Sequence, residues 1–259
     1  MISFCGDDLL GTPSSGLRWR IRGKCARWVG LWAAFNASAI VVKSDNLKES
    51  LPDRLNNKGV VTVLPNGVDI NWFYPMNQGE CRAGLGWPQD RKIVLFNASS
   101  KEDQYRKNPA LARATLDSVA RSMQGADLRM MSKASHEEVR LMMNAADCLL
   151  VTSLHEGSPN VVKEAMSCNL PVVSVPCGDV VERLKAVFPG SVRSFDVHDL
   201  AEAVIEVFRS GVRSNGRDQL IAQGLTTFHV AERLIHIYRR VQEESLSTAV
   251  VSQETTCVE

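Results

Sequence analysis

The sequence predicts an α/β fold in which helices cover both faces of a parallel sheet. Short apolar runs alternate with amphipathic helical segments along most of the chain, which is the pattern of β-α-β units. The apolar runs, such as Ile93–Phe96 and Cys148–Thr152, lack polar alternation, as expected of strands buried on both faces. Of the 259 residues, 44% are hydrophobic and 23% are charged, which is the composition of a chain with a packed core.

The first part of the chain yields few elements. Ala39–Lys43 (AIVVK) and Val60–Leu64 (VVTVL) are predicted strands, and Asn46–Leu55, with leucines at four-residue spacing, is a predicted helix. Pro65-Asn66-Gly67 then ends the second strand in a turn. We assign residues 1–64 to a partial Rossmann domain, too short for a full sheet, and interpret the chain as truncated at its N-terminus.

Residues 65–228 are predicted to form one complete Rossmann-like domain. Its predicted strands are Ile93–Phe96, Asp127–Met131, Cys148–Thr152 and Pro171–Val175. Its predicted helices are Pro109–Ser122, Ser135–Ala145, Pro159–Cys168, Asp179–Leu184 and Asp199–Arg209. Asn108 suits the N-cap of the first of these helices. Residues 229–246, with an amphipathic helix over Val230–Glu244, are expected to pack back toward the N-terminal part, and 247–259 to form a flexible polar tail.

Charge and cysteine content exclude several classes of protein. Thirty lysines and arginines balance 29 acids, a formal net charge of +1, so the basic excess of a general nucleic-acid binder is missing. The seven cysteines show no zinc-type spacing and the histidines form no ligand cluster, so no metal is predicted. Because no apolar run approaches the ~20 residues of a membrane span and no signal peptide opens the chain, we expect a cytoplasmic protein.

The strongest chemical signal follows the third predicted strand of the complete domain. Ligands of open α/β sheets bind at the carboxyl ends of strands. Gly157 would let a ligand approach the backbone there. With Ser158 as N-cap and Pro159 as first helical residue, the amides of Asn160 and Val161 would be free to bind an anion, above all a phosphate.

Two carboxylates, Glu156 and Glu164, frame this helix start. A carboxylate repels a phosphate but accepts hydrogen bonds from sugar hydroxyls. A phosphate at the helix start and hydroxyls at the acids together describe a nucleotide sugar. On spacing alone, a well-capped helix with two surface glutamates is an equal alternative.

Four motifs occur along the chain in a recognisable order. They are Asp7-Asp8-Leu9-Leu10; Leu64-Pro65-Asn66-Gly67-Val68-Asp69 with Phe73 and Pro75; Val94-Leu95-Phe96 through Lys107-Asn108-Pro109; and EGSPNVVKEAM, which contains Glu156 and Glu164, followed by CNLPVVSVPCGDVVERL. Together they resemble retaining glycosyltransferases of family four, and the resemblance covers roughly Ile2 to Val241. It implies the GT-B architecture of two Rossmann-like domains, with the C-terminal domain complete and the N-terminal domain partial.

The resemblance implies a role for each matching residue of the last motif. Glu164 would bind the ribose of the nucleotide, and Glu156 would lie beside the donor sugar as a catalytic residue. The donor-binding residues between them would be Gly157, Ser158, Asn160 and Val161, through their backbone amides, together with Pro159.

A basic pair neutralises the diphosphate leaving group in this family. Lys107 matches the lysine and is the second catalytic candidate, and Arg106 is the candidate for the arginine, with Lys101 upstream as an alternative. Fixed positive charge at a helix start stabilises a departing diphosphate, so no metal or other cofactor is expected. Asp7-Asp8 is interpreted as a helix cap or part of the acceptor side, and Cys5 stands where many members carry a histidine.

Two further segments remain open to two interpretations. The basic, tryptophan-bearing stretch Arg18–Trp32 could be an interfacial helix in peripheral contact with anionic lipid, or a face that is solvated or packs on the missing part of its domain. Asp179 and Glu182 have the spacing of a capping box, which we favour over substrate contact.

The predicted function is transfer, with retention, of a sugar from a nucleotide-diphospho-sugar donor to a glycan or lipid-linked acceptor. The resemblance points to bacterial polysaccharide or cell-envelope biosynthesis. A catalytically inactive nucleotide-binding fragment is the alternative. A nucleotide-sugar epimerase is disfavoured, because its usual catalytic acids and histidine find no match in the chain.

Overall fold

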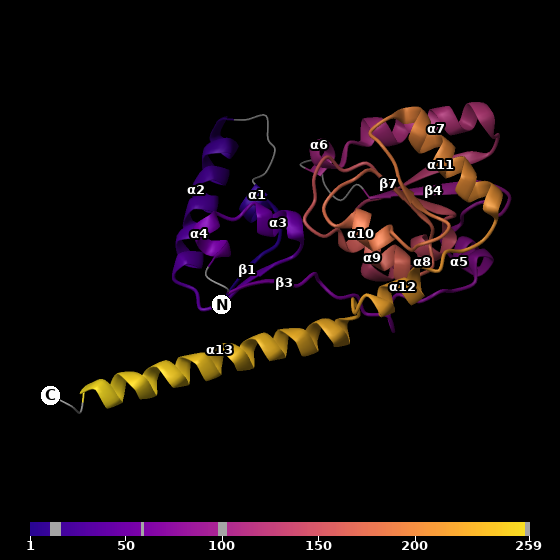
Figure 1. Ribbon diagram of the computed structural model, residues 1–259. Helices are drawn as coiled ribbons and strands as arrows, with labels where there is room; N and C mark the ends of the chain where they lie inside the picture. The colour runs from indigo at the N-terminus through magenta and orange to yellow at the C-terminus, as the bar shows by residue number, and fades with distance from the viewer. Residues whose placement is uncertain (11–16, 58–59, 98–102, 257–259) are drawn as a thin grey trace.

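Two parallel sheets organise the part of the chain that the computed structural model describes, which is residues 1–10, 17–57, 60–97 and 103–256 (Figure 1). Within these ranges the first sheet has the strand order β1-β2-β3 and the second the order β5-β4-β6-β7-β8. Every strand pair is parallel. The predicted α/β fold is therefore confirmed.

The first lobe is a small sheet with helices between its successive strands. Ile2 pairs with Ile40 and Ile40 with Val61, so the three strands start in register. The elements are β1 (Ile2–Phe4), α1 (Asp7–Leu10), α2 (Leu17–Phe35), β2 (Ile40–Val42), α3 (Asp45–Glu49), α4 (Asp53–Asn56) and β3 (Val61–Val63).

The second lobe contains the larger sheet and the main hydrophobic core. Its strands are β4 (Lys92–Asn97), β5 (Ala126–Met131), β6 (Cys148–Val151), β7 (Val172–Ser174) and β8 (Ser191–Val192). Its helices are α5 (Gln78–Leu85), α6 (Asp103–Lys107), α7 (Pro109–Ser122), α8 (His136–Ala145), α9 (Asn160–Ser167), α10 (Val180–Leu184), α11 (Val197–Ser210) and α12 (Gly216–Ala222). The four strands predicted for this lobe are all present, and no end is shifted by more than one residue.

The single helix predicted over Asn46–Leu55 is wrong, because the segment forms α3 and α4 with a break between them. Pro52 lies at the break as N-cap of α4. Proline has no amide to donate and disfavours helical backbone in the residue before it. Leu47 and Leu51 are nevertheless buried, as the leucine spacing indicated.

Two chain segments lie side by side where the lobes join: the linker at Val68 and the residues Leu225–Thr227. Val68 accepts a backbone hydrogen bond from Thr227 at 2.9 Å and donates one to Leu225 at 2.9 Å. A Cβ on Gly67 would lie 2.7 Å from the Thr227 Cα, so only glycine fits there. The linker and the start of α13 (Thr227–Thr256) therefore hold each other at the hinge between the lobes.

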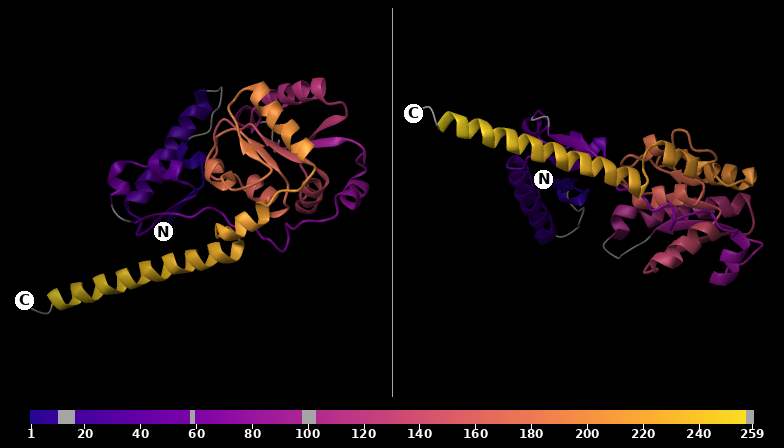
Figure 2. Two further views of the ribbon diagram at one scale, coloured as in Figure 1. Left: turned by 45° about the vertical axis from the view of Figure 1, so that its right-hand side comes forward. Right: turned by 90° about the horizontal axis from the view of Figure 1, so that it is seen from below.

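Helix α13 leaves the hinge and runs along the first lobe, with its C-terminal end projecting past that lobe (Figures 1 and 2). Ile237 and Leu234 pack with Val41 and Leu64 on the sheet face turned toward α13. Arg233 Nη2 donates to the Val63 carbonyl at 3.1 Å. The helix continues through 247–256, the residues assigned from the sequence to the tail. Within the described residues, no helix combines the length and the apolar character needed to cross a bilayer.

Candidate functional site

The strand order of the second sheet fixes where a site can form. From β4 the chain goes outward to β5 and then returns to the other side of β4 as β6. The loops that follow β4 and β6 diverge from each other at this point, which is where ligands of open α/β sheets bind. Arg106 and Lys107 follow β4, and Glu156 follows β6. The topology thus brings together residues about 50 positions apart in the sequence.

An ion triad forms at this point. Arg106 Nη1 lies 2.5 Å from Glu156 Oε2, and Lys107 Nζ lies 2.6 Å from Glu156 Oε1. The three side chains are 16%, 9% and 10% exposed, respectively. Because the surroundings exclude most of the solvent, these pairs are screened less than surface pairs. The triad carries a net charge of +1 and is suited to bind an anion.

The loops that carry the triad are tied to each other through the backbone. The Thr152 hydroxyl donates to the carbonyls of Lys107 at 2.8 Å and Asn108 at 3.0 Å. The Leu154 amide donates to the Arg106 carbonyl at 2.8 Å. Asn108 caps α7 through its side chain, as predicted. The basic pair is therefore held on a fixed backbone.

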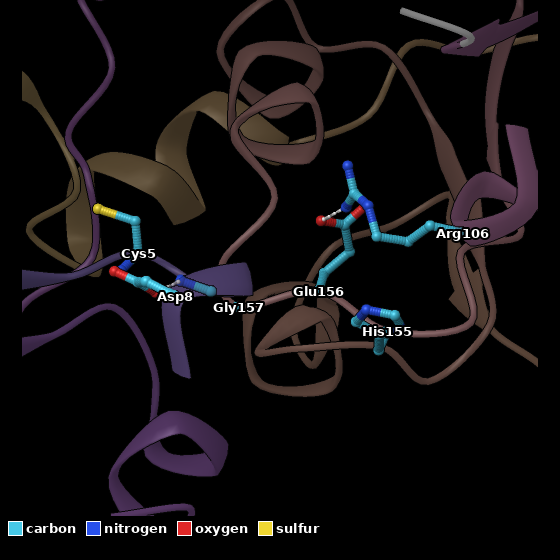
Figure 3. A pocket seen from close by; sticks show the side chains of 7 residues that line it. Cys5, Asp8, Arg106, His155, Glu156 and Gly157 are labelled. Atoms are coloured by element: carbon cyan, nitrogen blue, oxygen red, sulfur yellow. Dashed lines mark hydrogen bonds and ion pairs between the residues drawn. The ribbon is translucent and has the colours of Figure 1, made fainter. Parts of the chain in front are cut away.

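A cavity of about 420 Å³ lies between the lobes at the triad. Figure 3 shows Arg106 and Glu156 on one side of it and Cys5 and Asp8 on the other. The Asp8 carboxylate accepts the amides of Cys5 at 2.9 Å and Gly6 at 2.8 Å. The lining residues are Cys5, Gly6, Asp8, Arg106, His155, Glu156 and Gly157.

Gly157 is the point where the first lobe touches the second. A Cβ there would lie 2.9 Å from the Cys5 carbonyl oxygen and 2.9 Å from Leu47 Cδ1. Asn46 Nδ2 also donates to the Glu156 carbonyl at 3.2 Å. The sequence predicted that a ligand would approach the backbone at Gly157. In the structure, the backbone of Cys5 in the first lobe makes this close approach.

The predicted start of the following helix is wrong by one residue. Pro159 is the N-cap of α9, and the helix begins at Asn160, so Ser158 is not the cap. The Ser158 hydroxyl instead donates to Asp179 Oδ2 at 2.8 Å, because an ionised acceptor forms the stronger hydrogen bond. Val161 is buried, and the amides of Asn160 and Val161 belong to the first helical turn, which has no internal partners.

Glu164 lies in the second turn of α9. Among the described residues, no cation lies as close to its carboxylate as Arg106 and Lys107 lie to that of Glu156. Burial raises the pKa of its carboxyl to about 7, and the charge of the neighbouring Lys163 offsets only part of that shift. Within the described ranges, no hydrogen-bond donor or ion pair engages this carboxylate. It therefore has acceptor capacity to offer a ligand.

Lys163 is a buried residue that the sequence analysis missed. Its Nζ donates to the Asn66 carbonyl at 2.8 Å and the Ser158 hydroxyl at 3.1 Å. Burial lowers the pKa of this amine to about 8. No pattern in VVKEAM marks this lysine as buried, since its partner Asn66 belongs to the distant linker.

The capping box predicted for Asp179 and Glu182 is wrong. Asp179 is the N-cap of α10, but its side chain makes no capping hydrogen bond among the described residues. Its Oδ2 instead pairs with Arg183 Nε at 2.9 Å and accepts the Ser158 hydroxyl. Asp179 thereby links the start of α10 to the loop before α9.

Several predicted residues stand apart from this site or outside the description. Lys101 lies outside the described residues, as do the side chains of Asp7, Arg18, Trp19, Arg20 and Arg22. Lys24, Arg27, Trp28 and Trp32 are exposed on α2. Within the described ranges, no cluster of histidine, cysteine and acidic side chains could hold a metal ion.

Comparison with known proteins finds similarity to glycosyltransferases over the segment that carries this site. Residues 105–210 match the family described as glycosyl transferases group 1, and this segment contains Arg106, Lys107, Glu156 and Glu164. The D-inositol 3-phosphate glycosyltransferase of Mycobacterium bovis (strain BCG / Pasteur 1173P2) is 24% identical, over 70% of this chain and 44% of the relative. The chain thus spans less than half the length of the curated relatives it matches.

Solved structures give the same architecture. Sucrose-phosphate synthase from Thermosynechococcus elongatus superposes with a TM-score of 0.75 at 19% identity, covering 94% of this chain and 68% of that one. Anabaena HepE in complex with UDP and glucose superposes with a TM-score of 0.66 at 15% identity, covering 82% and 67%. The fold is that of GT-B glycosyltransferases, and residues 105–210 of this chain are similar to glycosyl transferases group 1.

Proposed function

We propose that the protein transfers a sugar, with retention at the anomeric carbon, from a nucleotide-diphospho-sugar donor to a glycan or lipid-linked acceptor. The observation that carries the proposal is the pairing of Arg106 and Lys107 with Glu156 at the edge of a cavity between two lobes. We also propose that this transfer belongs to bacterial polysaccharide or cell-envelope biosynthesis.

The proposed donor site follows from the charges. Departure of a nucleoside diphosphate builds negative charge on its phosphates. Arg106, Lys107 and the first turn of α9 supply fixed positive charge and free amides where that charge develops. Glu164, with its unengaged carboxyl, is proposed to accept hydrogen bonds from the ribose. We propose that this set of groups serves without a metal ion.

The proposed acceptor side is the opposite wall of the cavity. Asp8 is held there by two backbone amides and faces the wall that carries Arg106 and Glu156 (Figure 3). A carboxylate fixed in this way can bind an acceptor hydroxyl close to the donor sugar. Positioning of two reactants at about 3–3.5 Å is itself a large part of transfer catalysis.

The test is calorimetric titration with UDP and with GDP. We expect one of them to bind at micromolar to millimolar concentration, and binding to weaken when Lys107 is replaced. Failure of the wild-type chain to bind either nucleotide at millimolar concentration would refute the proposed donor site.

A nucleotide-binding protein without transfer activity is the second candidate. It is favoured by the small size of the first lobe, whose sheet has three strands among the described residues, since the acceptor surface must be built there. Incubation with radiolabelled nucleotide sugar and bacterial membrane extract separates the two candidates. Label entering a glycan or lipid fraction supports transfer, whereas binding without incorporation supports the second candidate.

We also propose that the protein is cytoplasmic and makes peripheral contact with the inner face of the membrane through α2. Gly30 and Ala34 face the first lobe, and a Cβ on Gly30 would lie 3.2 Å from the Phe4 ring. Trp28 and Trp32, four residues apart, are 69% and 63% exposed on the other side. Exposed tryptophans beside basic residues suit the interface of anionic lipid.

Vesicle sedimentation tests this contact. We expect binding to vesicles with phosphatidylglycerol, weaker binding to pure phosphatidylcholine, and loss of binding in the double variant Trp28→Ala, Trp32→Ala. Equal behaviour of the wild type and the double variant would remove α2 from the membrane contact.

A further inference from the structure

The further inference concerns Glu156, the ion-pair partner that Arg106 and Lys107 share. Each directs a charged donor at one oxygen of the same Glu156 carboxylate, at 2.5 and 2.6 Å. We propose that Glu156 competes with the donor's diphosphate for these two cations and thereby sets the affinity for the leaving group. This inference rests on the proposed function, since it assumes that the pair binds a diphosphate.

The competition follows from geometry and charge. Lys107 Nζ has three N–H donors, and one of them is directed at Glu156 Oε1 at 2.6 Å, so a phosphate oxygen bound to another would lie close to this carboxylate. Two anions at such a distance repel each other, and the repulsion is strong where the side chains are 9% and 10% exposed. A bound diphosphate and the present Glu156 pairing therefore oppose each other, and binding of the diphosphate favours movement of the carboxylate away from the cations.

The cavity gives the displaced carboxylate a place to go. Glu156 lines the space of about 420 Å³ between the lobes, on the side opposite Asp8. The carboxylate can rotate into this space while its backbone stays in place, because the Glu156 carbonyl is held by Asn46. The anionic wall at Asp8 makes this position costly unless hydroxyl donors occupy the cavity.

Sugar hydroxyls would supply those donors. A nucleotide sugar brings both the diphosphate that takes the cations and the hydroxyls that hydrogen-bond to the released carboxylate. The product nucleoside diphosphate has lost the transferred sugar and its hydroxyls, so Glu156 returns to Arg106 and Lys107 and opposes its binding. Glu156 is thus a specificity-determining residue that favours the intact donor over the spent one.

The test is Glu156→Gln, which keeps the shape and removes the charge. Calorimetry with UDP or GDP, whichever binds the wild type, with inorganic pyrophosphate, and with the matching nucleotide glucose gives the three dissociation constants. We expect the diphosphate and pyrophosphate to bind at least about tenfold tighter to the variant, from the loss of one charge-assisted competitor. The nucleotide sugar should gain less or lose affinity.

Two controls make the result specific. Glu164→Gln alters the other acid of the segment and should leave pyrophosphate affinity unchanged. Glu156→Asp keeps the charge but shortens the reach, so it should tighten diphosphate binding by less than Glu156→Gln. If Glu156→Gln folds poorly, the diphosphate affinity of Glu156→Asp still tests the inference.

The outcomes separate this inference from the proposed function. Wild-type binding of a diphosphate together with equal or weaker binding by Glu156→Gln overturns the inference and leaves the proposed donor site standing. Absence of diphosphate binding in the wild type and in every Glu156 variant overturns both.

Discussion

The two ends of the segment from Glu156 to Glu164 show how one residue type acquires two chemistries. At the loop end, Glu156 is paired with two cations. At the helix end, eight positions further, Glu164 is half-buried without an ion pair among the described residues, and burial raises its pKa to about 7. Environment separates the two carboxyls as it separates acid and base in many active sites.

This difference assigns the two ends different kinds of ligand groups. The loop end holds a net positive charge, so we expect it to bind an anion. The helix end holds a carboxyl that is partly protonated near pH 7 and can both accept and donate hydrogen bonds, which suits ribose hydroxyls. Each of the following experiments perturbs one end and measures whether the other end responds.

The largest effect is expected at the loop end from Lys107→Met. This variant removes a buried cation and leaves Glu156 with Arg106 alone. We expect nucleoside diphosphate affinity to fall by about 3 kcal/mol, roughly a hundredfold, which is the upper range for a hydrogen bond to a charged group. Calorimetry measures the loss, and Lys185→Met, at an exposed lysine, is the matched control. Equal losses in both variants would argue against a specific role for Lys107.

At the helix end, Glu164→Ala should weaken nucleoside diphosphate binding by about 1–3 kcal/mol. Inorganic pyrophosphate should bind the variant as it binds the wild type, because pyrophosphate has no ribose. Titration of both ligands measures the contrast. Parallel loss of nucleotide and pyrophosphate would mean that Glu164 acts on the phosphates, and the two ends would then not be distinct.

Much of this architecture could be predicted because it depends on local pattern. The apolar runs located four strands of the second lobe, and Asn108 was predicted as the cap of α7 that it proves to be. The strands β1 (Ile-Ser-Phe) and β8 (Ser-Val) were missed because neither lies in a continuous apolar run of the kind that marked the equally short β2. The break at Pro52 was missed because the leucine spacing suited one continuous helix.

The site was less predictable because its decisive contacts are long-range. The sequence indicated Lys107 and Glu156 separately, but their pairing depends on the order of β4 and β6 in the sheet. Ser158 and Asp179 each had a local capping role available, and their mutual hydrogen bond competes with both caps. Lys163 is buried only because the linker carbonyl of Asn66 lies over it.

A smaller effect is expected on stability from Glu164→Gln. The folded-state pKa of about 7 exceeds the ordinary value of 4.5, so between these values the folded protein keeps a proton that the unfolded chain releases. Wild-type stability therefore falls as pH rises from 4.5 to 7, and the cost of the buried charge is complete above that window.

The glutamine variant removes this cost. At pH 8 we expect its free energy of unfolding to exceed that of the wild type by an amount on the order of 1–2 kcal/mol. At pH 4 we expect the two free energies of unfolding to be equal. Urea denaturation at the two pH values measures the difference, with Glu182→Gln at an exposed position as control. A pH-independent difference would show that Glu164 is not the titrating group.

The smallest effect is expected from chelation. Arg106 and Lys107 place two positive charges at the loop end, where a divalent cation would otherwise neutralise a diphosphate. Excess EDTA should therefore leave nucleoside diphosphate affinity within about twofold of its original value. Calorimetry before and after chelation, with magnesium added back, provides the measurement. A strict requirement for magnesium or manganese would mean that the basic pair is insufficient, and Asp8, which lines the same cavity, would become the first residue to replace. If binding does not require a metal ion, the charge difference between Glu156 with its two cations and Glu164 remains the feature that directs the phosphates to one end of the segment and the ribose to the other.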